Sequence, residues 1–434
     1  MTRRMWIAAA LCTAAVLLFL AYAYPGFMSA DSCFQLGEAR AGEFSDWHPP
    51  MMAALWRLCD WVVSGPAGML LLQAGAFIAG VVVLVRKRRS TASALTAAAA
   101  LLVFPPLATT LAVIWKDSQM LGYLALGAAL IAPPSTRRTR IAGIAVLALA
   151  TAMRHNAFTI TFAIIVVLLE PPAWASRAVR RYAFSTAVWL AITLAAFGAN
   201  ALIADKHMHL WYRSLAMYDV LGTLHYAGPL DDTEIRDTLK GTHFEDTPPL
   251  QERVDQAYSP FLAVFKDLQV HFLYQPESEA ERAAIARAFR TVVENHPRAY
   301  LRHRMRAFEE VISLPPRKFG RVWAWYADPT VFSHEPGPVQ AALRDAAVWI
   351  GDTWLFWPFL YLLASCAIGA LAIRRRDSLV FALAASGVVS ELSLFFLAPN
   401  PDFRYSVWLV FTTLLAPWLL TRSPSGFTGL RGDN

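Results

Sequence analysis

Acidic, basic and aromatic side chains stand where long apolar segments of this chain end. The first group lies in residues 24–65, where Asp31 is followed by Ser45-Asp46-Trp47-His48-Pro49-Pro50. Further groups stand at Lys116-Asp117, Arg154-His155-Asn156 and Asp402-Phe403-Arg404-Tyr405. A carboxylate can act as a general base toward a hydroxyl, and the planar guanidinium of arginine fits phosphate oxygens. Brought together, these groups predict a site with one base and several cations that hold an anion.

The composition places these groups in a membrane protein. Of the 434 residues, 56% are hydrophobic and only 16% are charged, which is too little charge to cover so much apolar surface in water. The net charge of +7 comes from short basic clusters between apolar segments, where such clusters fix membrane orientation. We therefore predict an all-α polytopic membrane protein that does not bind nucleic acid.

Ten apolar segments are predicted to cross the membrane. They cover residues 6–22, 68–85, 92–114, 121–132, 141–153, 158–169, 184–203, 349–373, 379–397 and 407–420. Basic clusters alternate with them, at residues 86–89, 137–140, 177–181, 374–376 and 422. The positive-inside rule then puts both termini in the cytoplasm and all the polar groups on the outer face. Pro105-Pro106 is predicted to bend the third span. The short fifth and sixth spans are extended by flanking residues, are shielded by neighbours, or together form a re-entrant hairpin.

The chain divides into four parts by composition. These are an N-terminal transmembrane module (1–204) with a first outer loop (24–65), an extracytoplasmic soluble domain (205–347), a C-terminal transmembrane module (348–421) and a cytoplasmic tail (422–434). Apolar spacing predicts helices at 277–293 and 299–311, so the soluble domain is expected to be mainly helical. By its position alone, we expect this domain to select the molecule on which the polar groups act.

Each polar group also has an ordinary structural explanation. Asp31 could end or cap a helix, and Asp117 could cap the fourth span beside Lys116 as a snorkelling anchor. Arg154 could anchor a helix at the interface, and Arg404-Tyr405 could be a basic and aromatic pair of the interfacial belt. The shared placement of all groups at one face favours a site, because ionisable groups at span ends are costly unless they pair or line a polar cavity.

The first loop resembles that of the GT-C glycosyltransferases, in particular the protein O-mannosyltransferase and aminoarabinose-transferase branch. The resemblance lies in Asp31-Ser32, in Ser45-Asp46-Trp47-His48-Pro49-Pro50 and in the amphipathic segment 51–61 that follows. Asp117 at the start of the fourth span and Arg404-Tyr405 before the last span also match. The chain departs from the family at Ser32, where a second acid is usual, and at His48, where a lysine is often found. The resemblance covers residues 1–205 and 348–421.

The resemblance implies a fold with about ten transmembrane helices and an inverting transfer of sugar from a polyprenyl phosphate to an acceptor hydroxyl. Asp31 would be the general base, with Asp46 and Asp117 as the other catalytic candidates. Arginines would hold the leaving phosphate, and aromatic rings would stack on the sugar. The predicted substrate-binding residues are Trp47, His48, Lys116, Arg154, His155, Asn156, Arg404 and Tyr405. No cofactor is expected, and a divalent metal is not required in this scheme.

The implied partners are membrane lipids, a lipid-linked sugar donor, and a glycan, lipid or protein acceptor. The implied location is a bacterial cytoplasmic (inner) membrane, with the site facing outward. Three alternatives stay open: a lipid-linked oligosaccharide polymerase or ligase, a lipid or saccharide transporter, and an outer-side scaffold without chemistry. A transporter would carry charges near the bilayer midplane, whereas the predicted spans are nearly free of charge, with Glu391 as the exception in the interior of one.

Overall fold

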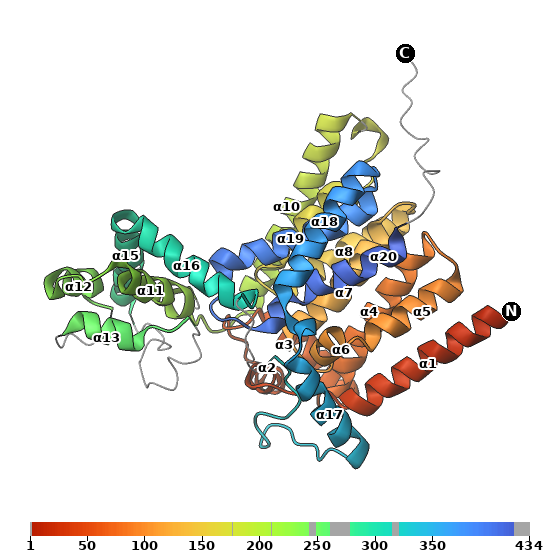
Figure 1. Ribbon diagram of the computed structural model, residues 1–434, viewed down its shortest axis with the longest axis horizontal. Helices are drawn as coiled ribbons and strands as arrows, with labels where there is room; N and C mark the ends of the chain where they lie inside the picture. Colours follow the sequence, from red (N-terminus) through yellow and green to blue (C-terminus); the bar gives the residue numbers. More distant parts are fainter. Residues whose placement is uncertain are drawn as a thin grey trace.

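The computed structural model is helical throughout the part of the chain that it describes. It describes residues 2–175, 177–209, 211–242, 249–260, 278–314 and 321–420, and the predicted tail 422–434 lies outside these ranges. Within them the only extended pairing consists of three isolated β-bridges. The predicted all-α class is therefore confirmed. A tilted helix bundle forms the larger part of the molecule, and a group of shorter helices lies beside it (Figure 1).

Four of the described helices are long and apolar enough to cross a membrane by themselves. They are α1 (Arg3–Ala23), α4 (Ala67–Arg86), α10 (Ala178–Ile203) and α19 (Ser378–Leu397). A fifth crossing is possible if α5 (Thr91–Leu102) and α6 (Pro105–Leu111) form one span, and this pair is bent by 74° at the predicted Pro105-Pro106 break. These helices support an integral membrane protein, whereas the count of about ten spans stays a prediction.

The other apolar segments form shorter helices that pack inside the bundle. They are α7 (Lys116–Ile131), α8 (Arg137–Met153), α9 (Ala157–Leu168), α18 (Pro358–Arg374) and α20 (Val407–Leu419). Helix α7 packs between α4 and α8, while α19 packs on α9, α18 and α20. The α4–α7 approach depends on Gly122, because a Cβ there would lie 2.5 Å from the carbonyl oxygen of Gln73.

The predicted eighth span, 349–373, is wrong at its start. Helix α17 (Pro338–Gly351) ends before the apolar segment is complete, a 3₁₀ turn covers Trp354–Phe356, and α18 begins only at Pro358. Proline is favoured in the first turn of a helix because it lacks the N–H that would go unpaired there. Pro358 therefore marks a new helix within an apolar run that hydropathy alone reads as continuous.

The basic clusters gather at one end of the bundle, which we call the basic end. Arg88 pairs with Asp377 at 2.8 Å, and this contact joins the α4–α5 turn to the α18–α19 turn. Lys87 donates to the carbonyl of Ala132 at 2.6 Å, beyond the end of α7, and Arg140 pairs with Glu170 at 2.6 Å. Because helices alternate in direction, the opposite ends of α7, α8, α9, α19 and α20 also lie together. We call that end the site end.

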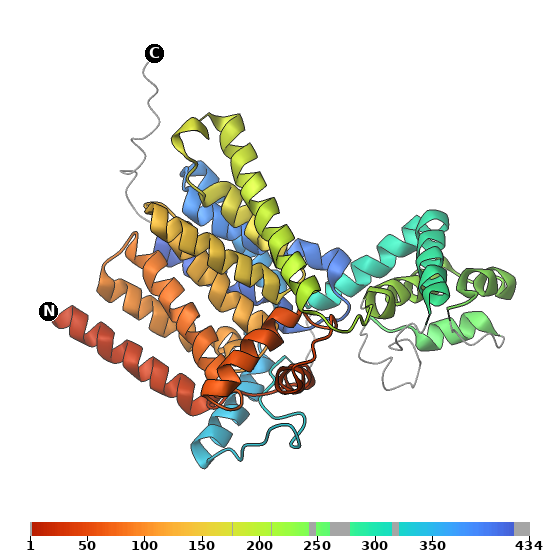
Figure 2. The same cartoon turned by 180° about the vertical axis from the view of Figure 1, so that it is seen from behind.

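Five described helices form a separate unit beside the site end. This unit lies at the left in Figure 1 and at the right in Figure 2, which shows the molecule from behind. This middle domain consists of α11 (Met217–Ala227), α12 (Asp232–Leu239), α13 (Leu250–Ala257), α15 (Glu279–Asn295) and α16 (Pro297–Val311). It has its own buried apolar core, which includes Leu221, Val254, Ile285 and Val292. The helices predicted at 277–293 and 299–311 are confirmed as α15 and α16. Helix α16 also packs against α19 of the bundle.

Candidate active site

The first loop positions Asp31 through a short capped helix, α2 (Ala30–Ala41). Ser29 caps this helix, and its side chain forms a reciprocal capping box with Ser32. The Ser32 hydroxyl also donates to the carbonyl of Ile114 at 2.7 Å. The backbone of Phe27 pairs with Ala112 and Ile114 on both sides, at 2.9 and 3.0 Å. Serine at position 32 thus fixes the first loop to the segment just before Lys116, and Asp31 in the first turn lies beside it.

His48 lies between Asp31 and Lys116. Its ring is 5% exposed, with Nδ1 2.8 Å from Lys116 Nζ and Nε2 3.7 Å from an oxygen of Asp31. An ammonium can only donate, so Nδ1 accepts and the neutral imidazole carries its proton on Nε2, toward Asp31. Burial holds the pKa of His48 well below its usual value, and the neighbouring Lys116 adds to this shift. Pro50 begins α3 (Pro50–Val62), as predicted, so the part of the first loop that carries His48 ends directly at the start of a helix.

Arg404 is the centre of the charged cluster. It lies in a 3₁₀ turn, Phe403–Ser406, and its guanidinium is 2.9 Å from Asp31, 2.8 Å from Asp402 and 3.8 Å from Asp117. The guanidinium also stacks over the ring of Trp115, 4.6 Å from the ring centroid. Burial is the largest single effect and opposes ionisation of Asp31, but the positive groups around it, Arg404 first, together outweigh it and hold the pKa of this carboxyl well below its usual range. Asp31 is therefore a carboxylate, with 28% of its side chain exposed.

Arg154 completes the cluster from the end of α8. It forms an ion pair with Asp117, which is fully buried, and its guanidinium lies 4.4 Å from the ring centroid of Tyr405. The Tyr405 hydroxyl in turn donates to Asn400 at 2.6 Å. Two arginines therefore share the buried carboxylate of Asp117, which neutralises part of their charge and fixes their positions.

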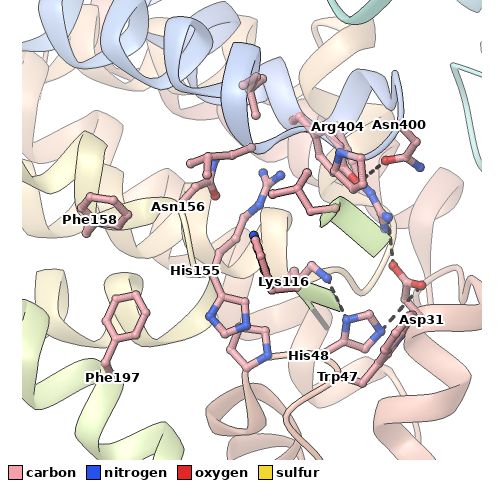
Figure 3. A pocket seen from close by; sticks show the side chains of 18 residues that line it. Asp31, Trp47, His48, Lys116, His155, Asn156, Phe158, Phe197, Asn400 and Arg404 are labelled. Atoms are coloured by element: carbon pink, nitrogen blue, oxygen red, sulfur yellow. Dashed lines mark hydrogen bonds and ion pairs between the residues drawn. The ribbon is translucent and has the colours of Figure 1, made fainter. Parts of the chain in front are cut away.

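These side chains line a cavity of about 570 Å³. Figure 3 shows its two ends: Asp31, His48, Lys116 and Arg404 lie at one side, and Phe158 and Phe197 at the other. Other apolar side chains that line the cavity include Trp211, Leu215, Leu394 and Leu397. The cavity thus offers a charged end next to an apolar one, both at the site end of the bundle.

The structure brings most of the predicted residues together, although their roles stay predictions. The residues that line the cavity are Asp31, Trp47, His48, Lys116, Arg154, His155, Asn156, Arg404 and Tyr405. Asp117 lies behind the cavity wall. Asp46 does not line the cavity, because its carboxylate accepts from the backbone of Met208 and contacts His207 Nδ1 at 3.1 Å. Its contacts fasten the first loop to the segment that follows α10.

Sequence reasoning missed several residues of the site. Trp115 stacks on Arg404, although it stands directly before the predicted Lys116 in the sequence. Asp402 belongs to one of the predicted polar groups, but its place as the nearest acid partner of Arg404 was not predicted. Most of the apolar residues that line the cavity do not stand beside predicted polar groups, so the sequence carried no comparable indication of them. Phe158 and Phe197 look like ordinary span residues, and Trp211 lies in the polar stretch between the transmembrane modules. In the described ranges no three histidine, cysteine or acidic side chains lie together as ligands for a metal ion. That the reaction requires no divalent metal therefore stays a prediction from the sequence.

No family model and no curated protein matches the sequence. The fold is similar to ArnT from Cupriavidus metallidurans bound to undecaprenyl phosphate, with a TM-score of 0.37 and 13% identity over 96% of this chain and 79% of that one. ArnT in the apo state gives 0.34 and 14%, over 95% and 78%. The archaeal oligosaccharyltransferase AglB from Archaeoglobus fulgidus, in complex with an inhibitory peptide and a dolichol-phosphate, gives 0.41 and 12%, over 95% of this chain and 50% of AglB. Both are GT-C glycosyltransferases, the family that the first loop resembles. With TM-scores this low, the activity has to be inferred from the side chains of the site.

Proposed function

We propose that this protein is a membrane glycosyltransferase that moves a sugar from a polyprenyl phosphate to an acceptor hydroxyl, with inversion at the anomeric carbon. The observation that supports it best is the cavity itself, where the partly exposed carboxylate of Asp31 stands 2.9 Å from Arg404 and close to Lys116 and Arg154. A reaction that removes a proton at one atom and releases a phosphate at another needs this combination of a base and several cations.

The proposed step follows from the positions of these groups. The acceptor hydroxyl attacks the anomeric carbon, its proton passes to Asp31, and the bond between that carbon and the phosphate oxygen breaks. The lipid phosphate leaves with the electron pair of that bond. Arg404 and Arg154 meet the developing charge with charge-assisted hydrogen bonds, and Lys116 adds a third positive charge. The rings of Trp47 and Tyr405 line the same cavity and offer faces for the sugar.

Donor binding would also change the state of Asp31. With no anion present, Arg404 is shared among Asp31, Asp402 and, at longer range, Asp117. A phosphate that draws the guanidinium toward itself weakens the hold of Arg404 on Asp31, and the pKa of that carboxyl then rises toward the range of a useful base. The arrangement therefore favours donor binding before proton transfer.

The apolar end of the cavity suits the other half of the donor. Phe158, Phe197, Leu394 and Leu397 stand where a prenyl chain could leave the charged end toward the hydrocarbon. The positive-inside rule places the basic end of the bundle in the cytoplasm and the site end outside. We infer that transfer takes place at the outer face of a bacterial cytoplasmic membrane, and that the acceptor is a glycan, lipid or protein presented there.

The decisive experiment is transfer by purified protein from a polyprenyl-phosphate monosaccharide. Asp31→Asn is expected to lower the rate by about 10²- to 10⁴-fold, because the amide cannot take the proton. Glu43→Gln is the matched control, since Glu43 belongs to the same loop but pairs with Lys206 at the surface and lies outside the cavity. Near wild-type transfer by Asp31→Asn would contradict the assignment. Activity that needs a lipid-linked oligosaccharide in place of the monosaccharide would favour a polymerase or ligase.

A further inference from the structure

A buried charged cluster in the middle domain takes no part in the proposed transfer. Asp219 of α11 receives two side chains of α16, with His303 Nε2 at 3.0 Å and Arg304 Nη2 at 2.6 Å. Asp219 is 1% exposed, and His303 and Arg304 are fully buried. The helices meet closely because residue 222 is glycine: a Cβ there would lie 2.0 Å from His303 Nδ1. Buried ion pairs are costly to desolvate and contribute little net stability, so their occurrence here calls for another role.

Arg304 uses its other terminal nitrogen to contact the membrane bundle. Nη1 donates to the carbonyl of Ala398 at 3.2 Å, across 94 residues of sequence. Ala398 is the cap residue that directly follows the last residue of α19, Leu397. Helix ends leave carbonyl groups without partners in the helix, and Arg304 satisfies this one from the neighbouring domain. One guanidinium therefore joins the carboxylate of the middle domain to the start of the α19–α20 connection.

The connection that begins at Ala398 carries residues of the site. Asn400 lines the cavity and accepts from Tyr405, and Arg404 forms the ion pair with Asp31. Apolar packing follows the same route, because Phe308 of α16 shares a buried cluster with Ala398 and Tyr405. Figure 1 shows α16 extending from the middle domain to the end of α19. Residues 398–406 are thus held from the middle domain on one side and face the cavity on the other.

We propose that Arg304 is a positioning residue for the site: through Ala398 it fixes residues 398–406 and thereby the place of Asn400 and Arg404. Its effect on transfer rests on the proposed function, whereas its effect on the connection does not. The middle domain then contributes directly to the geometry of the phosphate-holding cluster. Small displacements matter there, because a shift of about 1 Å in a positioned group can cost about 10²-fold in rate.

The variant Arg304→Lys distinguishes a role of Arg304 in positioning residues 398–406 from a general effect on the stability of the middle domain. A lysine keeps the positive charge beside Asp219 but has all its donors on one nitrogen, so it cannot place one nitrogen on Asp219 and a second on Ala398 as the guanidinium does. The control is Arg302→Lys, on the same helix but exposed, where the guanidinium stacks over Tyr226 at 5.0 Å. Both variants are made in the full chain. Amide hydrogen exchange is followed by mass spectrometry, and kcat and KM are measured with a polyprenyl-phosphate monosaccharide.

Arg304→Lys is expected to speed exchange in peptides covering 398–406 while α11 and α15 exchange as in the wild type. Transfer is expected to fall by up to about 10²-fold in kcat/KM, and Arg302→Lys should change neither measurement. Unchanged exchange over 398–406, or equally faster exchange across the whole middle domain, would overturn the proposal. If exchange changes as expected but wild-type protein transfers no sugar, the positioning link stands and the proposed function fails.

Discussion

At the scale of single residues, the site depends on which groups hold charge when no substrate is bound. Three carboxylates surround Arg404, and one of them, Asp31, is the proposed base. His48 stays neutral between Asp31 and Lys116, with Nε2 3.7 Å from the carboxylate of Asp31 and Nδ1 hydrogen-bonded to Lys116. The positive charge next to His48 therefore lies on Lys116 of α7.

The pH dependence of transfer should report Lys116. Burial lowers the pKa of Lys116 to about 8, with the charge of Asp31 opposing that shift. If the ammonium helps to hold the donor phosphate, kcat/KM for the donor falls as the pH rises through about 8. Lys116→Arg keeps a positive charge throughout this range, so the alkaline fall near pH 8 should disappear. The same fall in both proteins would show that Lys116 is not its origin.

The free energy of unfolding should rise with pH over the range in which transfer falls. The pKa of Lys116 is about 8 in the folded protein and close to its ordinary 10.5 when unfolded, so the unfolded chain binds more protons between these values. The contribution of Lys116 to the free energy of unfolding therefore rises with pH across this window while transfer falls. Thermal unfolding of the wild type and of Lys116→Arg separates the two effects, because the arginine variant lacks this rise.

At the scale of elements, the bend between α5 and α6 allows the first loop to meet α7. After Ala112, which caps α6 in a helical conformation, the backbone leaves the helix, and Ala112 and Ile114 pair with Phe27 of the first loop. This leaves carbonyl groups inside an apolar bundle, where each must find an internal donor. Gln73 of α4 supplies it: Nε2 donates to Leu111 at 2.7 Å and to Val113 at 3.0 Å, and the side chain is fully buried.

Gln73→Leu should therefore destabilise the protein. Each carbonyl that loses its donor costs about 1–3 kcal/mol, because the buried group cannot return to water. We expect a clearly lower midpoint of thermal unfolding in detergent. Gln256→Leu is the control, because Gln256 is exposed on α13 and bonds only to Glu252 among the contacts described for it. Equal midpoints for both variants would mean that water or a shifted backbone satisfies these carbonyls.

At the scale of the whole molecule, the site requires that distant segments meet at one end of the bundle. Asp31, Lys116, Arg154 and Arg404 come from four separate parts of the chain and line one cavity. The basic clusters lie at the other end. This separation explains how a protein with so few charges can keep several buried ones: they neutralise each other in one place, and the rest of the bundle stays apolar.

Cysteine labelling tests the orientation that the proposal requires. In a background without the four native cysteines, Glu43→Cys reports the first loop and Arg375→Cys reports the basic end; both positions are exposed. A membrane-impermeant maleimide should label Glu43→Cys in intact cells, and Arg375→Cys only after the membrane is opened. Labelling of Arg375→Cys alone in intact cells would place the site in the cytoplasm.

The helical class, the Pro105-Pro106 bend and the two long helices α15 and α16 could be predicted from the sequence. Each depends on a local signal: apolar spacing, or a residue that cannot continue a helix. The start of α18 was mistaken because hydropathy does not distinguish one apolar helix from two joined by a turn. The polar residues at the segment ends could likewise be named, since a charge beside an apolar segment is conspicuous wherever it stands.

The amino-acid sequence alone indicates an integral membrane protein and shows which polar residues stand at the ends of its apolar segments. The three-dimensional structure was needed to show that Asp46 holds the first loop, that Asp117 lies behind the cavity wall and that Arg304 reaches Ala398. The reason is that hydropathy and capping act over a few neighbouring residues. Which side chains share a cavity is set instead by helix tilt and packing between segments that stand far apart in the chain.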